Sequence, residues 1–346
     1  MTLARRAILA APFIAAGTSA FETSAFAQTS GWDRVVETAN KQGHLNLVHN
    51  LPPPLGDYWI ADFNKAFPKI RVEATRLGSS EQAQRFNTEY PAGASTADAC
   101  ITLWDDMVLT WASNGWIRDW KPPEAAAFDP KYVVRDRIFV TQVIRSSLMS
   151  NKTKVKEPDA PKDWTDVFNP KWKDRVGVDP PWRSVAVQQM LAVWDDLGIK
   201  DVAKRLKENG VRFFNGSAGV VQALIRGDIW VAAVIEPPGI NAIGDGAPVR
   251  ISYPSSVIPA VGTPCFVPAK CPHPEAGMVF INWSMSAAGQ ASLQEKMGSP
   301  VTRPNAGDPK LVPGLGGQKI ALSADSLTPA KQKAIIDEWR QVFGLQ

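Results

Sequence analysis

The chain has 346 residues, of which 45% are apolar and 21% are charged, and its formal net charge at neutral pH is +4. This composition is that of an ordinary globular protein with enough residues for two hydrophobic cores, and it excludes an intrinsically disordered chain. Because the charge is small and no run of five basic residues occurs, nothing in the sequence indicates a nucleic-acid partner.

Residues 1–27 are typical of a secretory signal peptide. A pair of arginines at positions 5 and 6 precedes an apolar stretch over residues 7–16, and Ala-Phe-Ala at 25–27 offers a cleavage site. The arginine pair leaves two export routes open, the general route and the twin-arginine route for folded proteins. No other apolar stretch approaches the roughly 20 residues of a membrane-spanning helix. We therefore predict a soluble periplasmic protein.

Helix and strand patterns alternate along the rest of the chain. Helical periodicity over residues 32–42 and 57–67 predicts two helices, and Pro68 ends the second of them. Residues 78–81 offer an N-cap for a third helix. Apolar alternation or short apolar runs predict five strands: His44–Val48, Ile70–Thr75, Ala99–Leu103, Arg175–Val178 and Val231–Ile235. The alternation predicts a three-layer α/β sandwich with mainly parallel strands.

Small or polar residues occupy several of the predicted strand-to-helix transitions. They are Gly78-Ser79-Ser80, Arg183-Ser184 and the run from Asn215 to Gly219. The unpaired backbone N–H groups of a helix start bind carboxylate, phosphate or phosphonate oxygens. Ordinary helix capping is the alternative for any single loop, whereas several such loops on one rim favour a binding site.

Glu236 directly follows the apolar run Val231–Ile235 and precedes two prolines. Ligands of open α/β sheets bind outside the carboxyl ends of the strands, so Glu236 is a candidate ligand contact. A solvated loop acid is the alternative. Glu236 or Asp105 would pair with a ligand amine, whereas beside a plain anion Glu236 would accept backbone N–H bonds or pair with an arginine.

The cysteines and histidines give no sign of a metal site. Cys100 lies in an apolar run and is predicted to be in the core. Cys265 and Cys271 are interpreted as two buried thiols at a strand end, with a short disulfide loop as the alternative. The three histidines are scattered, and no Cys-x-x-Cys or His-x-x-x-His spacing occurs. We predict no metal and no cofactor.

Six segments carry a resemblance to a known family. They are "LNLVHN", "GSSEQAQRF" followed by "STADACITLWDD", "DAPKDWTDVFNPKWKDRVGVDPPWRSVA", "GVRFFNGSAGVVQALIRGDIWVAAVIEPPG", "GAPVRISYP" and "CPHPEAGMVFINWSMSAAGQASL". With these segments the chain resembles the periplasmic solute-binding proteins of ABC importers, in the extracellular solute-binding family that includes ferric-iron, polyamine, thiamine and aminoethylphosphonate binders. The most specific segment is residues 159–178, and the resemblance covers nearly all of the chain after residue 27.

The resemblance implies a type II periplasmic binding protein fold, with two three-layer α/β/α lobes joined by a hinge. One lobe would comprise residues 28–140 with 259–303, and the other residues 141–258 with 304–346. The lobes would close on a small molecule and present it to an ABC permease in the inner membrane. Because no phosphate-binding G-x-x-x-x-G-K loop occurs, the ATPase must be a separate chain. We expect the binding protein to be a monomer.

The candidate ligand-binding residues follow the predicted strand ends or lie near the hinge. They are His49, Asn50, Arg76, Ser79, Trp104, Asp105, Arg145, Trp182, Arg183, Ser184, Asn215, Ser217 and Glu236. Arginines facing a cleft recognise carboxylate or phosphonate oxygens, although surface ion pairs are the alternative. Trp104 and Trp182, from opposite lobes, would sandwich a ligand or pack in the cores. Three tryptophans in helical patterns, Trp194, Trp283 and Trp339, are predicted to be in the core.

These residues predict a small organic anion or zwitterion as the ligand, with a polyamine-like cation as the alternative because tryptophans and acids could form a box. In the iron binders of the family, paired tyrosines follow the strand that corresponds to Val231–Ile235. Here those positions are Pro238 and Gly239, and Leu103 or Trp104 replaces the acidic ligand. Ferric iron is therefore a remote alternative. A secreted enzyme is another, since the sequence has no G-x-S-x-G elbow or other nucleophile motif.

Overall fold

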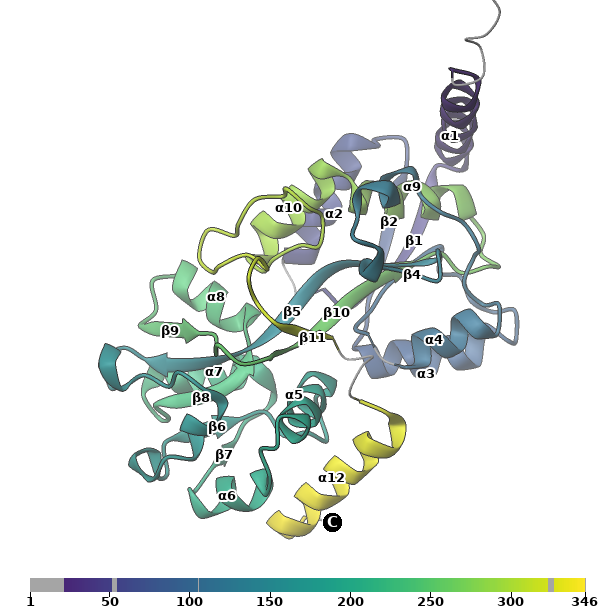
Figure 1. The fold of residues 1–346 in the computed structure, drawn as a ribbon. Helices are drawn as coiled ribbons and strands as arrows, with labels where there is room; N and C mark the ends of the chain where they lie inside the picture. The colour runs from purple at the N-terminus through teal and green to yellow at the C-terminus, as the bar shows by residue number, and fades with distance from the viewer. Residues whose placement is uncertain (1–21, 52–54, 105, 323–326, 346) are drawn as a thin grey trace, which may run out of the picture.

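A computed structural model describes residues 22–51, 55–104, 106–322 and 327–345 of the chain (Figure 1). The fold is a two-lobed α/β architecture in which helices cover both sides of a mixed sheet. Most of the predicted signal peptide lies outside the described residues. Within the described part of the chain, no helix has both the length and the apolar character needed to cross a membrane.

One continuous sheet runs through both lobes, in the strand order β2-β1-β3-β10-β5-β8-β6-β7. The strands are β1 (His44–His49), β2 (Arg71–Arg76), β3 (Ala99–Ile101), β5 (Ile138–Asn151), β6 (Val176–Val178), β7 (Arg212–Phe213), β8 (Val231–Ile235) and β10 (Ile258–Phe266). Three further strands pair beside this path: β4 (Val133–Val134), β9 (Val249–Ser252) and β11 (Ile320–Leu322).

The helices divide between the two ends of the sheet. At the β1–β3 end lie α1 (Glu22–Gln42), α2 (Leu55–Ala66), α3 (Ser79–Glu89), α4 (Asp106–Ser113), α9 (Pro274–Met285) and α10 (Ala287–Met297). At the other end lie α5 (Val185–Asp196), α6 (Val202–Glu208), α7 (Gly216–Arg226), α8 (Pro237–Gly244) and α12 (Pro329–Phe343). Short 3-10 helices are η1 (Pro123–Ala127), η2 (Pro130–Tyr132), η3 (Glu157–Asp159), η4 (Trp164–Phe168) and η5 (Pro170–Trp172).

The long strand β5 passes from one lobe into the other. Its residues from Phe139 to Arg145 pair with β10, whereas its residues from Ser146 to Ser150 pair with β8. Both pairings are antiparallel. Arg145 is therefore the residue at which β5 changes its partner strand.

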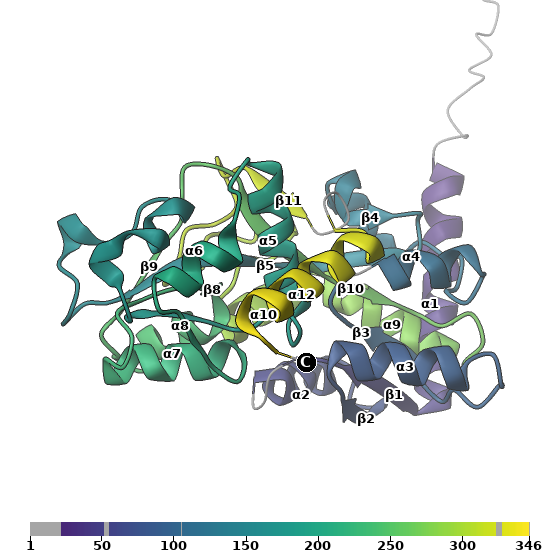
Figure 2. The same ribbon diagram turned by 90° about the horizontal axis from the view of Figure 1, so that it is seen from below.

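Separate hydrophobic cores stabilise the two ends of the molecule. The core beside β1 and β3 includes Trp59, Phe280 and Trp283, and a second core beside β6 includes Trp194 and Trp339. A third cluster lies between α7, α8 and β8. Helix α12 packs on α5 and α6 (Figure 2), so the C-terminal helix belongs to the second core. The predictions that Trp194, Trp283 and Trp339 lie in the core are confirmed.

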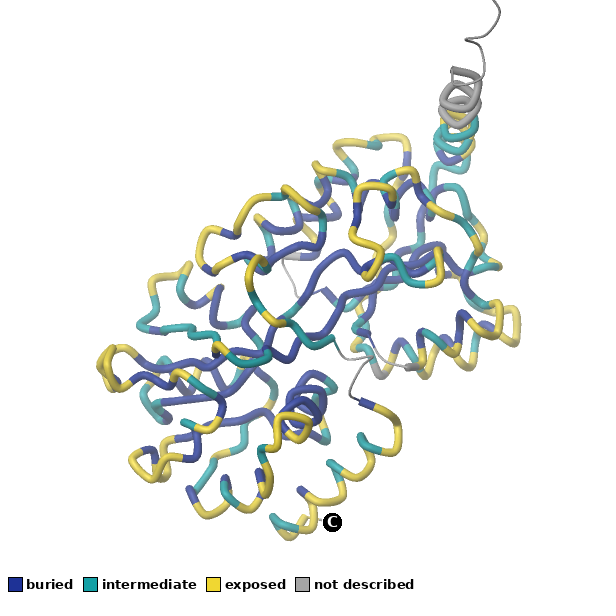
Figure 3. Tube along the Cα trace, viewed as in Figure 1, coloured by how far each residue is buried: buried dark blue, intermediate teal, exposed yellow. Residues whose placement is uncertain are grey.

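All five predicted strands are present, within two residues of their predicted ends. The expectation of mainly parallel strands is wrong, because five of the ten strand pairings among the described residues are antiparallel. The sequence did not predict the short strands β4, β7, β9 and β11 or the long strand β5, and it indicated β10 only at its end. Both β5 and β10 are buried along nearly their whole length (Figure 3), so neither shows the alternation by which a strand is recognised.

The three cysteines are free thiols. Cys100 and Cys265 are buried, as predicted, while Cys271 is only partly buried. Burial is the main reason that the pKa values of Cys265 and Cys271 rise to about 12. Both thiols therefore stay protonated at neutral pH.

Candidate functional site

Four of the predicted site residues come together where β1 and β2 end. His49 and Arg76 are register partners in the parallel pair of these strands. Asn50 Nδ2 donates to Ser79 Oγ at 3.3 Å, and Arg76 Nε donates to the carbonyl oxygen of Leu51 at 2.9 Å. Ser79 is the first residue of α3. The loops after two neighbouring strands thus bring an imidazole, an amide, a hydroxyl and a guanidinium onto one edge of the sheet.

His49 is buried at this edge, with 3% of its surface exposed. Burial lowers its pKa below the ordinary value, the Asp57 carboxylate opposes this shift, and the Arg76 charge adds to it. The imidazole is therefore neutral at physiological pH. Its Nδ1 atom is buried and has no hydrogen-bond partner within the described part of the chain. A polar group of a solute could supply that partner.

Trp104 follows β3 and packs in the core of the first lobe. Its side chain is buried, and its backbone N–H donates to the carbonyl oxygen of Gly262 in β10 at 2.9 Å. Of the two roles considered for this residue, packing is thus visible in the structure, and ligand contact stays a prediction. The neighbouring candidate, Asp105, lies outside the described residues.

The second lobe brings its predicted residues together at the starts of α5 and α7. Ser184 is the N-cap of α5, and its hydroxyl accepts from Val187 N at 3.4 Å. Asn215 is the N-cap of α7, and Ser217 lies in the first turn of that helix. Trp182 is half-buried with its ring edge-on to Phe213. Arg183 is exposed.

Asp179 is a residue of this cluster that the sequence analysis missed. It directly follows β6, is 4% exposed, and accepts from the Ser217 hydroxyl at 3.4 Å. Burial raises its pKa above the ordinary aspartate value, although Ser217, Arg183, Gly216 and Ser184 each oppose the shift. A signal was available, because an acid immediately after a buried strand is the pattern that singled out Glu236.

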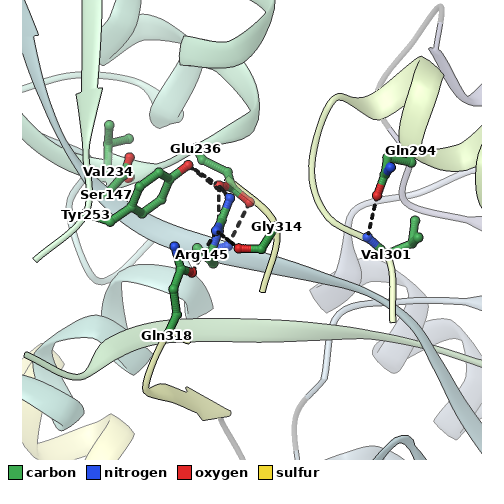
Figure 4. Close-up of polar contacts among 9 residues, drawn as sticks. All are labelled: Arg145, Ser147, Val234, Glu236, Tyr253, Gln294, Val301, Gly314 and Gln318. Carbon is green, nitrogen blue, oxygen red and sulfur yellow. Dashed lines mark hydrogen bonds and ion pairs between the residues drawn. The ribbon is translucent and has the colours of Figure 1, made fainter. Parts of the chain in front are cut away.

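Arg145 and Glu236 are joined as a buried ion pair at the point where β5 passes between the lobes (Figure 4). Neither side chain is exposed. The guanidinium Nε and Nη2 atoms lie 2.9 and 2.8 Å from Glu236 Oε2. The backbones of the same two residues are also bonded, with Glu236 N donating to the carbonyl oxygen of Arg145 at 2.9 Å. The alternative that Glu236 is a solvated loop acid is therefore wrong.

Three residues from distant parts of the chain complete this pair. The Tyr253 hydroxyl donates to Glu236 Oε2, and Arg145 Nη1 donates to Gln318 Oε1 at 2.7 Å and to the Gly314 carbonyl oxygen at 3.3 Å. Burial and the Glu236 carboxylate raise the pKa of Tyr253, so its phenol keeps its proton. We call these five residues the hinge network. Every nitrogen of the Arg145 guanidinium is bonded within it, so this arginine has no donor group directed at solvent.

The sequence matches the family model described as bacterial extracellular solute-binding protein, over residues 58–314. No curated protein matches the chain. Many solved structures match it. One is the substrate-binding protein of an ABC transporter from Agrobacterium tumefaciens, which is 17% identical with a TM-score of 0.76, over 86% of this chain and 94% of that one.

Two further structures show the range of solutes carried by similar folds. Iron-bound HitA from Pseudomonas aeruginosa is 21% identical with a TM-score of 0.71, over 86% of this chain and 99% of that one. AfuA from Actinobacillus pleuropneumoniae, with fructose-6-phosphate bound, is 16% identical with a TM-score of 0.72, over 88% and 99% of the two chains. At such identities the likeness shows the two-lobed fold, while the solute has to be argued from the residues.

Titration with ferric citrate should produce no visible charge-transfer band, because a phenolate ligand for iron is not provided at the positions of Pro238 and Gly239. The phenol nearest in sequence, Tyr253, donates its proton to Glu236 and has a raised pKa. Among the described residues, no group of three or more His, Cys, Asp or Glu side chains is placed to hold a metal ion. A strong absorption band at one equivalent of iron would contradict this prediction.

Proposed function

The chain belongs to the family of bacterial extracellular solute-binding proteins, and we propose that it serves an ABC importer by carrying a small organic anion or zwitterion between its two lobes. It would bind this solute in the periplasm and deliver it to an inner-membrane permease that works with a separate ATPase. The proposal is for binding and release, without chemical change of the solute.

The observation that carries the proposal is the gathering of polar residues at strand ends in both lobes. His49, Asn50 and Ser79 lie together in the first lobe, and Ser184 and Ser217 lie at neighbouring helix starts in the second. Open α/β sheets bind ligands outside the carboxyl ends of their strands. Two such clusters on one chain support a site that both lobes complete.

The anionic part of the solute would be held by helix starts and by arginines. Gly78, the N-cap of α3, makes no side-chain cap bond, so the first-turn N–H groups of this helix remain suited to an anion. At the start of α7 the Asp179 carboxylate already lies beside Ser217 and the Gly216 N–H. Arg76 and Arg183 are exposed and suited to carboxylate or phosphonate oxygens. Arg145 contributes less directly, since it is committed to the hinge network.

The lobes would comprise residues 28–140 with 259–303 and residues 141–258 with 304–346. In support of this division, α9 and α10 pack in the core of β1 and β3, while Trp339 of α12 packs with the core of β6. The hinge would lie in β5 at Arg145, where the strand changes partners.

A polyamine-like cation is the second candidate solute. The observation in its favour is Asp179, a buried acid within the cluster of the second lobe. Trp182 is half-buried nearby and would supply an aromatic face to a cation.

Binding of the natural solute should reduce the radius of gyration measured by X-ray scattering, because contacts from both lobes favour a closed hinge. Native mass spectrometry of protein purified from the periplasm would identify the solute. A thermal-shift assay would confirm it, since a ligand at 100 times its Kd stabilises by about 2.7 kcal/mol. A saturated sample whose scattering curve equals that of the ligand-free protein would contradict the two-lobed binding function.

A further inference from the structure

Asp179 lies close to the first residues of two helices in the second lobe, α5 and α7. It follows β6 and accepts through Oδ2 from the hydroxyl of Ser217, in the first turn of α7. The N-cap of α5, Ser184, is also close enough to lower the pKa of the carboxyl group, as are the Gly216 backbone N–H and the Arg183 charge. These groups favour the ionised carboxylate, yet burial outweighs them.

The second oxygen of this carboxylate is left unused. Asp179 Oδ1 is buried and has no hydrogen-bond partner within the part of the chain that the structure describes. An ionised carboxylate only accepts hydrogen bonds, so the missing partner must be a donor. A buried acceptor without a partner lowers the stability of the ligand-free protein. Such groups are rare in folded proteins, so this one indicates a binding partner or another function.

Helix capping does not account for the Oδ1 atom of Asp179. The start of α5 already has the Ser184 hydroxyl, which accepts from Val187 N. At the start of α7, Asp179 Oδ2 accepts from the Ser217 hydroxyl and the Gly216 backbone N–H also favours the carboxylate, but Oδ1 has no hydrogen-bond partner among the described residues. The unpaired oxygen is buried, and the carboxylate lies beside Ser184 and Ser217, which the proposed function assigns to the solute.

We propose that Asp179 is the residue that recognises a positively charged hydrogen-bond donor on the solute, a primary ammonium group. This inference rests on the proposed function and narrows it: the solute is an amine-bearing zwitterion or a polyamine, and a plain diacid is excluded. The ammonium would supply the donor that Oδ1 lacks. An acid end, where the solute has one, is left to Arg76 and the start of α3.

The variant Asp179→Asn tests the inference before any solute is known. It removes the buried charge at the same volume, so the ligand-free variant should melt at a higher temperature than the wild type at about pH 8. A carboxyl group with a raised pKa destabilises the folded state only when ionised, so this difference should vanish as the pH falls to about 4. Glu208→Gln, which removes an exposed charge from α6, is the control and should show neither effect.

A matched set of four-carbon to six-carbon compounds tests recognition. Succinate, 4-aminobutanoate and 1,4-diaminobutane each have four carbons and differ in whether their ends are acids or amines. Their five-carbon and six-carbon homologues test longer distances between the two end groups. Wild-type protein should bind an amine-bearing member in isothermal titration. Asp179→Asn should lose about 30-fold or more of that affinity, as for the truncation of one partner in a buried charge pair. Glu208→Gln should bind as the wild type does.

Several outcomes would overturn the inference. One is a solute identified by native mass spectrometry that has no amine, and another is binding of the diacids alone. Equal affinity of Asp179→Asn and wild type for an amine, or a lower melting temperature for that variant at about pH 8, would overturn it as well. In the first two cases the solute-binding function stands. Only the absence of any bound or co-purified small solute, together with an unchanged scattering curve, counts against both.

Discussion

Replacing Arg145 with alanine should lower the free energy of unfolding by about 3–5 kcal/mol, because the change leaves the Glu236 carboxylate buried without its counter-charge. Both side chains are fully buried, and the guanidinium lies 2.8 Å from the carboxylate. Glu236→Gln should also be destabilising, since it removes the charge that Arg145 and the Tyr253 hydroxyl are arranged around. Urea denaturation of the ligand-free variants measures both effects.

The matched control for this experiment is Arg226→Ala. Arg226 pairs with Asp228 at 2.8 Å, the same separation, but the two side chains are 58% and 39% exposed. The loss should be at most about 1 kcal/mol, because solvent screens a surface pair. If Arg145→Ala unfolds at the wild-type urea concentration and instead loses solute affinity, the arginine is a ligand contact and its structural role is wrong.

The hinge network also includes the segment between α10 and β11. Gln318 and Gly314 lie in this segment, and both accept hydrogen bonds from Arg145 Nη1. Arg145 lies in β5, and Glu236 is the residue that follows β8. Arg145 Nη2 also donates to the Tyr253 hydroxyl, so this one side chain joins four segments at the place where β5 changes partners. We expect its loss to loosen the hinge as well as destabilise the fold.

Gly277→Ala should destabilise the protein by about 3 kcal/mol, near the upper end for overpacking a closely packed site. A Cβ atom at this position in α9 would lie 2.2 Å from the carbonyl oxygen of Asp98. A backbone atom cannot move aside as the end of a side chain can. Asp98 is further fixed because its carboxylate accepts from His273 N at 2.7 Å and from Asn46 N at 2.8 Å. Thermal and urea unfolding measure the loss.

A second glycine in a helix provides the control for Gly277→Ala. Gly31 lies within α1, and no heavy atom lies within 4 Å of the position that a Cβ would take. Gly31→Ala should leave stability unchanged or raise it by up to about 1 kcal/mol, as expected from helix propensity. Equal unfolding midpoints for Gly277→Ala and Gly31→Ala would show that α9 can move away from Asp98, contrary to the packing described.

Elements whose signals are local could be predicted from the sequence alone. The strand β8 occupies the predicted residues, and the helices expected after Gly78, Arg183 and Asn215 all begin there. Such signals lie within a few residues of each other: an apolar run bounded by prolines, or a capping residue before a helical pattern. The family, and with it the two-lobed fold, could be predicted from segments of the same kind.

The roles of the polar side chains depend on contacts that form only when the chain folds. Arg145 and Glu236 were both predicted to be site residues, but they are 91 residues apart, and no local pattern reveals that they neutralise each other. Tyr253 and Gln318 joined the same network without any sequence signal. Asp179 had the same local pattern as Glu236, yet one carboxylate has an arginine and the other keeps an unpaired oxygen. Charge pairing depends on distance in space, which the chain fixes only when it folds.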